Sequence, residues 1–164
     1  NMNYFMDPTI LIFAKLVLAA FLGMLIGTER ALFAKQAAGL RTFGLVSLGA
    51  CLFIVAGNTA NAEYIGLVNF DPSRVLASVV QGIGFLGAGL IILQGNLLRG
   101  VTAAAGLWVA AGVGAVVGLG LYSIAFFTAV LTIIIFLAMW YVEKNFKEWF
   151  NGLEGETRHE SHGE

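Results

Sequence analysis

Charged residues are scarce in this chain of 164 residues, making up 12% of it, whereas 59% of the residues are hydrophobic. The mean hydropathy is +0.85. A soluble domain of this size cannot bury so much apolar surface, so the composition predicts an integral membrane protein. The net charge of −1 gives no support to a nucleic-acid partner.

The residues that catalysis and metal binding need are equally few. Cys51 is the single cysteine, and both histidines lie in the last six residues. One cysteine forms neither an intrachain disulfide nor a set of zinc ligands, and no nucleophile has a base near it in the predicted topology. In that topology Glu29 lies at the cytoplasmic end of a crossing and Asp71 at the outer end of another. Because the two carboxylates are on opposite sides of the membrane, they cannot share one Mg²⁺ ion. We therefore predict no enzyme activity, no cofactor and no metal site.

The apolar residues fall into blocks of about 20 residues, the length that crosses a bilayer. Residues 100–142 carry no charge, and as one helix they would extend about 65 Å, twice a hydrocarbon core of about 30 Å. This stretch must fold back, and Gly118 and Gly120 favour a turn there. We predict an all-α integral membrane protein whose domain, residues 2–142, has five transmembrane helices at about 9–26, 40–57, 73–93, 101–117 and 119–142.

Basic residues alternate between the connections. Arg30, Lys35 and Arg41 follow the first crossing, Arg99 follows the third, and Lys144 follows the fifth. Because Lys and Arg are retained on the cytoplasmic side, the N-terminus is predicted outside and the C-terminus in the cytoplasm.

The C-terminal segment, residues 143–164, is predicted to leave the bilayer. Phe146 and Trp149 alternate with Lys144 and Lys147, a pattern typical of an interfacial amphipathic extension. The residues from Asn151 onward are rich in Gly, Glu, Ser and His and are predicted to form a disordered cytoplasmic tail.

Small residues recur along the first, third and fourth crossings and predict close helix packing. Those of the third crossing occupy two faces, which predicts a central helix. Those of the fourth recur every four residues and predict a groove that suits a homodimer. The helix-packing glycines are Gly23, Gly27, Gly82, Gly84, Gly87, Gly89, Gly106, Gly114 and Gly118.

Polar residues near the crossings have a structural and a functional interpretation. Asp71 can cap the third helix or pair with Arg74. Glu29 can bridge Arg41 or Arg99, or these residues can simply anchor the topology. Gln81, near the middle of the third helix, is predicted to join helices or to contact a substrate. The candidate polar network is Glu29, Arg30, Arg41, Asp71, Arg74, Gln81 and Arg99.

Lys15 lies within the first crossing, on the face that also carries Ala19, Gly23 and Gly27. Its long side chain can extend to the membrane surface. The alternative is an ion pair with Asp71.

Three separated motifs resemble the MgtC/SapB family of bacterial membrane proteins: "GTERALFAKQAAGLRTFGLVSLGACLF", "DPSRVLASVVQGIGFLGAGLI" and "RGVTAAAGLWVAAGVGAVVGLGLY". They occur in the expected order and cover nearly all five crossings. The resemblance implies a multi-pass protein of the bacterial inner membrane, linked in pathogenic relatives to virulence, intracellular survival and magnesium homeostasis. The chain is similar to the short members that have only the transmembrane region.

Two functions follow from these observations. The first is a regulatory or interaction protein whose partners are membrane lipids, a second copy of the chain in a dimer and, by resemblance, another membrane protein such as the F-type ATP synthase. The alternative is a small ion or metabolite transporter or channel, with the third and fourth helices lining the path.

Overall fold

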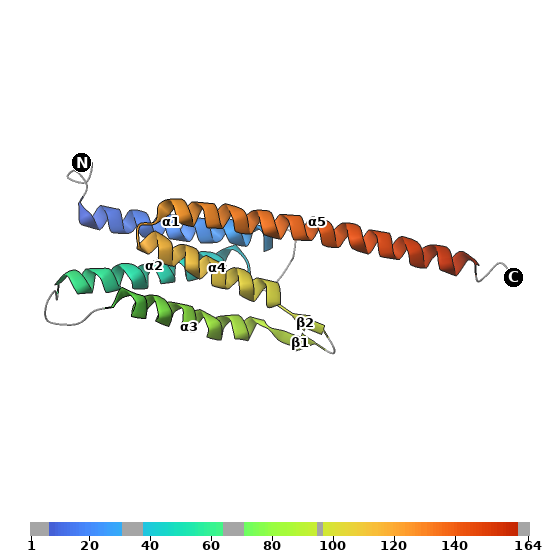
Figure 1. Ribbon diagram of the computed structural model, residues 1–164, viewed down its shortest axis with the longest axis horizontal. Coiled ribbons are helices and arrows are strands. Elements are labelled where there is room, and N and C mark those ends of the chain that lie inside the picture. Colours follow the sequence, from blue (N-terminus) through green and yellow to red (C-terminus); the bar gives the residue numbers. More distant parts are fainter. Residues whose placement is uncertain (1–6, 31–37, 64–70, 95–96, 161–164) are drawn as a thin grey trace. The chain divides into compact units, whose positions relative to one another are not determined.

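The computed structural model describes residues 7–30, 38–63, 71–94 and 97–160. In these residues the helices are α1 (Pro8–Glu29), α2 (Leu40–Glu63), α3 (Pro72–Leu90), α4 (Val101–Gly118) and α5 (Tyr122–Glu160), and a hairpin of β1 (Ile92–Gln94) and β2 (Leu97–Arg99) joins α3 to α4 (Figure 1). Each of the five helices is long and apolar enough to span a membrane. The predicted all-α architecture with five candidate crossings is therefore confirmed.

The chain forms two compact units, Asn1–Ile133 and Ile134–Glu164. The first unit contains α1 to α4 and the beginning of α5, and the second contains the rest of α5. In the second unit, Lys144 Nζ lies 5.7 Å from the centroid of the Trp140 ring, a cation–π contact.

Helix α5 continues to Glu160, whereas the sequence predicts disorder from Asn151. Leucine, glutamate and arginine favour helix in this segment, and no proline interrupts it. Residues 161–164 of the predicted tail lie outside the described residues.

Helices α1 and α3 begin at the same local motif, Asp-Pro. The carboxylates of Asp7 and Asp71 accept hydrogen bonds from the backbone N–H groups of Thr9 and Ser73, each at 2.9 Å. Proline follows each aspartate at the first helical position, where no N–H is needed. The backbone hydrogen bond from Thr9 holds the pKa of the Asp7 carboxyl below its ordinary value.

The turn between α4 and α5 confirms the fold-back predicted at Gly118 and Gly120. Gly120 has a φ of 84°, which L side chains rarely adopt. Its N–H donates to the carbonyl of Val117, and the N–H of Leu121 donates to the carbonyl of Val116, both at 2.9 Å. This pair of hydrogen bonds is a Schellman motif, which ends a helix and reverses the chain.

The β hairpin occupies a stretch that the sequence assigns partly to the third helix. Helix α3 ends at Leu90 rather than near Leu93, and Ile92 pairs with Arg99 across the hairpin. Gly100 follows β2 with a φ of 87° and is the N-cap of α4. A Cβ at Gly100 would collide with the carbonyl oxygen of Leu90, so only glycine fits between the hairpin and α4.

Helices α1, α2 and α4 pack through positions that lack side chains. A Cβ at Gly23 would lie 2.6 Å from the carbonyl oxygen of Phe43, and one at Gly114 would collide with the carbonyl of Ser47. The Ser47 hydroxyl, fully buried, donates to the carbonyl of Ala19 at 2.7 Å. Ser47 thus lies where the three helices meet.

The order of these contacts fixes the helix directions. Along α2 and α4, contacts advance together from Ser47 with Gly114 to Ile54 with Gly118, so these helices are parallel. Gly27 of α1 contacts Gly39 at the start of α2, so α1 is antiparallel to α2. The end of α1, the start of α2 and the start of α4 therefore lie at one end of the first unit, called here the basic end.

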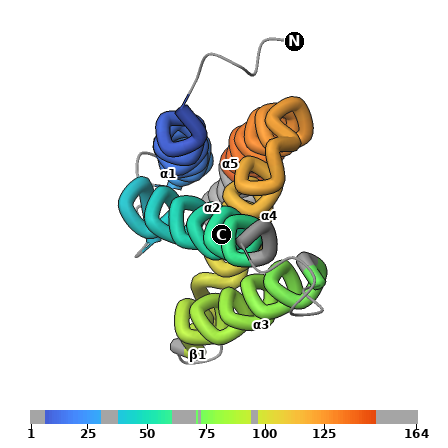
Figure 2. Tube along the Cα trace, turned by 90° about the vertical axis from the view of Figure 1, so that its left-hand side faces the viewer, coloured from blue at the N-terminus to red at the C-terminus, as the bar shows by residue number. Residues whose placement is uncertain are grey.

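The prediction that the third helix is central is wrong, because α4 takes that place. In the spanning windows of the two helices, 61% of α4 is buried but only 11% of α3. Helix α3 lies at the edge, away from α1 (Figure 2). Small residues show where another backbone can approach, but they do not show that a helix of the same chain does so.

Candidate functional site

The basic end is built by the close approach of α1 and α2. A Cβ at Gly27 would lie 3.0 Å from the backbone of Gly39 and Leu40, so the chain cannot accept a larger residue there without a shift. Glu29 and Arg30, at the end of α1, are buried, each with 5% of its surface exposed. Arg30 Nε lies 3.5 Å from Glu29 Oε2, and the two side chains form an ion pair.

The ion pair of Glu29 differs from the two that the sequence suggests. Arg41 and Arg99 are both exposed, and neither forms an ion pair with a described residue. The partner of Glu29 is instead its neighbour Arg30, which is buried with it. A buried carboxylate needs a cation close by, and the adjacent residue supplies it at the least cost in chain entropy.

The four charged residues described at the basic end, one glutamate and three arginines, thus differ in exposure. Glu29 and Arg30 neutralise each other inside the protein, whereas Arg41 and Arg99 present two positive charges at the surface. These two guanidinium groups can bind anionic groups from outside the bundle.

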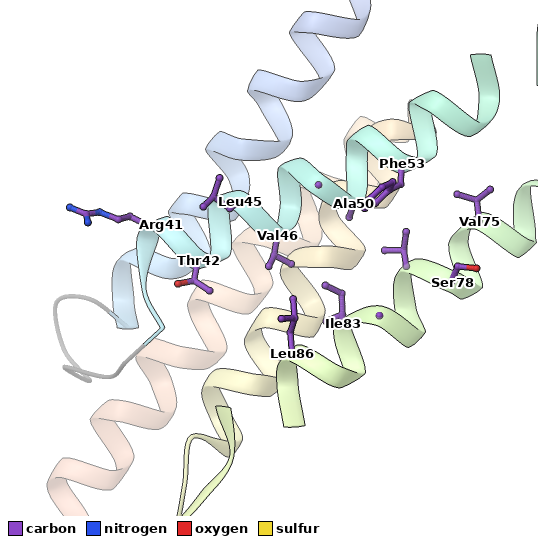
Figure 3. Close-up of a pocket in the computed structure, with 13 residues that line it drawn as sticks. Arg41, Thr42, Leu45, Val46, Ala50, Phe53, Val75, Ser78, Ile83 and Leu86 are labelled. Atoms are coloured by element: carbon purple, nitrogen blue, oxygen red, sulfur yellow. The ribbon is translucent and has the colours of Figure 1, made fainter. Parts of the chain in front are cut away.

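A groove of about 780 Å³ runs between α2 and α3. Its walls are mostly apolar and include Leu45, Val46 and Phe53 of α2 and Ile83 and Leu86 of α3 (Figure 3). Arg41 and Thr42 border it at the basic end, and Ser78 borders it on α3. The sequence gives no sign of this groove except for glycines on both helices.

The polar residues of α3 lie on its exposed side. Arg74 is exposed and forms no ion pair with Asp71 among the described residues, so the Asp71 carboxylate acts there as a helix cap. Gln81 is also exposed, and its amide has no hydrogen bond to a described residue. Gln81 therefore points away from the neighbouring helices that the sequence predicts it to join.

The predicted packing glycines fall into two groups. Gly23, Gly27, Gly114 and Gly118 face other helices closely, Gly106 is buried, and a Cβ at Gly87 would lie 3.7 Å from the Ala104 Cβ. By contrast, a Cβ at any of three glycines of α3 would meet no described atom within 4 Å: Gly82, Gly84 and Gly89. Since α2 occupies the face of α4 at Gly114 and Gly118, the α4 groove predicted for a dimer is filled within the chain at these positions.

Lys15 contacts a backbone carbonyl at the end of α4 rather than the membrane surface or Asp71. Its Nζ donates a hydrogen bond of 3.0 Å to the carbonyl oxygen of Gly118. The Schellman motif leaves this carbonyl without a backbone donor among the described residues. The ammonium group therefore caps the negative end of the α4 dipole, and Lys15 is not paired with Asp71.

We expect Lys15→Met to lower the free energy of unfolding in mixed micelles by about 1.5–3 kcal/mol, because a carbonyl in an apolar environment loses a charged donor. Lys15→Arg retains a donor and should lose less. Lys144→Met, which removes an exposed lysine and its cation–π contact with Trp140, is the control and should lose no more than about 1 kcal/mol. Unfolding by SDS, followed by circular dichroism, measures the loss. Equal stability of Lys15→Met and the parent chain would contradict this role.

Among the described residues there is no group of three or more His, Cys, Asp or Glu side chains that could hold a metal ion. At the basic end, the exposed guanidinium groups of Arg41 and Arg99 can bind anionic groups. The groove offers an apolar surface beside it.

Comparison with known proteins finds the same family that the three sequence motifs resemble. Residues 16–145 match the MgtC family. YhiD of Escherichia coli (strain K12), named "Putative magnesium transporter YhiD", is 40% identical over 123 residues, which cover 74% of this chain and 57% of YhiD. The protein MgtC of Salmonella typhimurium (strain LT2) is 44% identical over 106 residues, covering 65% of this chain and 42% of that protein.

The protein MgtC of Brucella abortus (strain 2308) is 45% identical over 117 residues, covering 71% of this chain and 45% of the relative. The chain spans about half the length of the curated relatives it matches. No solved structure matches it. The family match extends over most of the chain, from α1 into α5, and includes the residues of the basic end and the groove. This protein is therefore a membrane protein of the MgtC family.

Proposed function

We propose that the protein is an interaction module of the bacterial inner membrane, with its N-terminus outside, and that it acts as a homodimer joined through α3. The observation that supports this most directly is the exposed Gln81. In lipid, an amide without a hydrogen-bond partner is costly, because no water replaces the missing bond. A second copy of α3 supplies both a donor and an acceptor to the same amide.

The surroundings of Gln81 favour a protein rather than a lipid contact. Gly84 and Gly89 leave open space above the α3 backbone, which lets another helix come close. Phe85 is 81% exposed and offers a large apolar surface on this helix. The orientation of the protein in the membrane is supported by the basic end. Arg41 and Arg99 both lie there, and arginines are retained preferentially on the cytoplasmic side.

We expect Gln81→Leu to weaken dimerisation about 3- to 30-fold, the range of interhelical hydrogen bonds in membranes. Donor- and acceptor-labelled copies in vesicles of varied protein density report the dimer by energy transfer. The control is Thr128→Leu, which changes a polar residue on α5. A monomer at all densities, or equal dimerisation of the two variants, would contradict the proposal.

The second candidate function is magnesium transport. It is supported by the name of YhiD, to which this chain is 40% identical. Sealed vesicles that contain the purified protein and a magnesium-sensitive dye would test it. Uptake above that of empty vesicles, reduced by substitutions in α3 or α4, would favour transport. Uptake at the background rate, in vesicles where the dimer forms, would favour the interaction module.

A further inference from the structure

The groove between α2 and α3 remains open because of where small residues lie. On the side toward α4, Ala50, Ile83 and Ala111 form a buried cluster, with Val46 and Val79 packed against it. On the groove side, Gly49 and Gly82 both line the space, and a Cβ at either would meet no described atom within 4 Å. Helices α2 and α3 therefore pack together on the side that faces α4, and they leave the groove between them on the other side.

The size of the groove decides what can occupy it. A helix with its side chains is about 10 Å wide, so a spanning helix of about 30 Å occupies on the order of 2,000 Å³. The groove holds about 780 Å³, so it cannot enclose a whole spanning helix. A hydrocarbon chain is much thinner than a helix, and the apolar walls match its chemistry.

Charge at the basic end decides which kind of lipid fits. Arg41 borders the groove, and its guanidinium group extends away from the apolar lining residues (Figure 3). An arginine side chain is long enough to reach the headgroups from the end of a membrane-spanning helix. The described acidic side chain nearest along the chain, Glu29, is buried in its pair with Arg30. The exposed charge of Arg41 is therefore available to an anion.

The start of α2 adds a second attraction for an anion. Phe43 donates its N–H to the carbonyl of Gly39, so Gly39 is the residue that begins this helix. Glycine has no side chain with which to cap the free N–H groups of the first turn. Thr42, which also borders the groove, adds a hydroxyl donor. At the opposite end of the groove, near Val75 and Ser78, none of the described lining residues is charged.

We propose that this groove binds an acyl chain of an anionic phospholipid whose phosphate lies at Arg41 and the first turn of α2. The complementarity is twofold: a cationic end for the headgroup and an apolar channel for the hydrocarbon. The site does not depend on dimerisation through α3, because it lies between two helices of one chain.

The test compares lipid retained by the purified full chain after reconstitution with phosphatidylglycerol or with phosphatidylcholine and return to detergent. Native mass spectrometry counts lipids and chains in each complex. We expect phosphatidylglycerol to be retained in preference. Arg41→Gln should lower its retention about fivefold, whereas Arg99→Gln, an exposed arginine that does not line the groove, should lower it less than twofold.

Filling the groove tests the acyl chain separately. Gly82→Leu should abolish retention of both lipids, and Gly84→Leu, on the same helix but outside the groove, should leave retention unchanged. If Gly82→Leu loses helicity, Gly49→Leu makes the same test from α2.

Three results would overturn the proposal. The first is equal retention of the two lipids by the parent chain. The second is equal loss in the Arg41 and Arg99 variants. The third is a groove variant that retains phosphatidylglycerol but no longer forms two-chain complexes, because that outcome would identify a second copy as the occupant.

Discussion

Gly114→Ala should destabilise the protein by about 1–3 kcal/mol or more, and Gly114→Leu should prevent folding. A Cβ at this position would collide with the carbonyl of Ser47 and would lie 2.8 Å from its Cα. The obstacle is backbone, so a change of rotamer cannot relieve it. Helices α2 and α4 would have to separate, and the Ser47 hydrogen bond to Ala19 would be strained with them.

Gly112 provides a matched control for this result. It lies two residues earlier on α4, and a Cβ there would meet no described atom within 4 Å. Gly112→Ala should leave the free energy of unfolding unchanged or raise it by up to about 1 kcal/mol, because alanine favours helix more than glycine does. SDS titration in mixed micelles measures both variants. Equal losses of unfolding free energy in Gly114→Ala and Gly112→Ala would contradict a close contact between Gly114 and the backbone of Ser47.

Gly100→Ala is expected to have the second largest effect. Its φ of 87° costs an L side chain about 1–3 kcal/mol, and the new Cβ would also collide with the Leu90 carbonyl oxygen. Relief of that collision requires the β hairpin to move away from the start of α4. The cost of strain and the cost of collision should therefore add.

Two other glycines separate these costs. Gly120 has a similar φ of 84°, but the nearest atom that its Cβ would meet is Lys15 Nζ at 4.0 Å, so Gly120→Ala reports strain alone. Gly89 is helical and a Cβ there would meet no described atom within 4 Å, so Gly89→Ala reports neither cost. The loss of stability should increase from Gly89 through Gly120 to Gly100. If Gly100→Ala lost no more than Gly120→Ala, the collision with Leu90 would be excluded.

The architecture of this chain follows from features that are local in the sequence. Apolar runs of spanning length predict five helices, because the uncharged stretch of residues 100–142 is long enough for two and requires the turn that Gly120 makes. The Gly-Asn pair at 95–96 is typical of tight hairpin turns and indicates a turn between the third and fourth crossings. The strands on either side are not predictable in the same way, because three-residue strands carry little periodicity.

The candidate site is harder to predict because it depends on which helices become neighbours. The sequence shows that Lys15 faces the packed side of α1, but only the structure shows the Gly118 carbonyl opposite it. Similarly, Gly49 and Gly82 are 33 positions apart and form a groove only because α4 holds their helices together. Gln81 is exposed because α3 lies at the edge of the first unit. The small residues of α3 do not reveal this position in the sequence.

The central place of α4 sets an order for assembly during synthesis. Helices α1 and α2 emerge first and can join at once through Gly23 and Ser47. Helix α3 follows, but its main partner is α4, which the ribosome has not yet made. Until α4 enters the bilayer, the newly inserted α3 has little to hold it against the α1–α2 pair. The packing of α3 can therefore be completed only after α4 has been made.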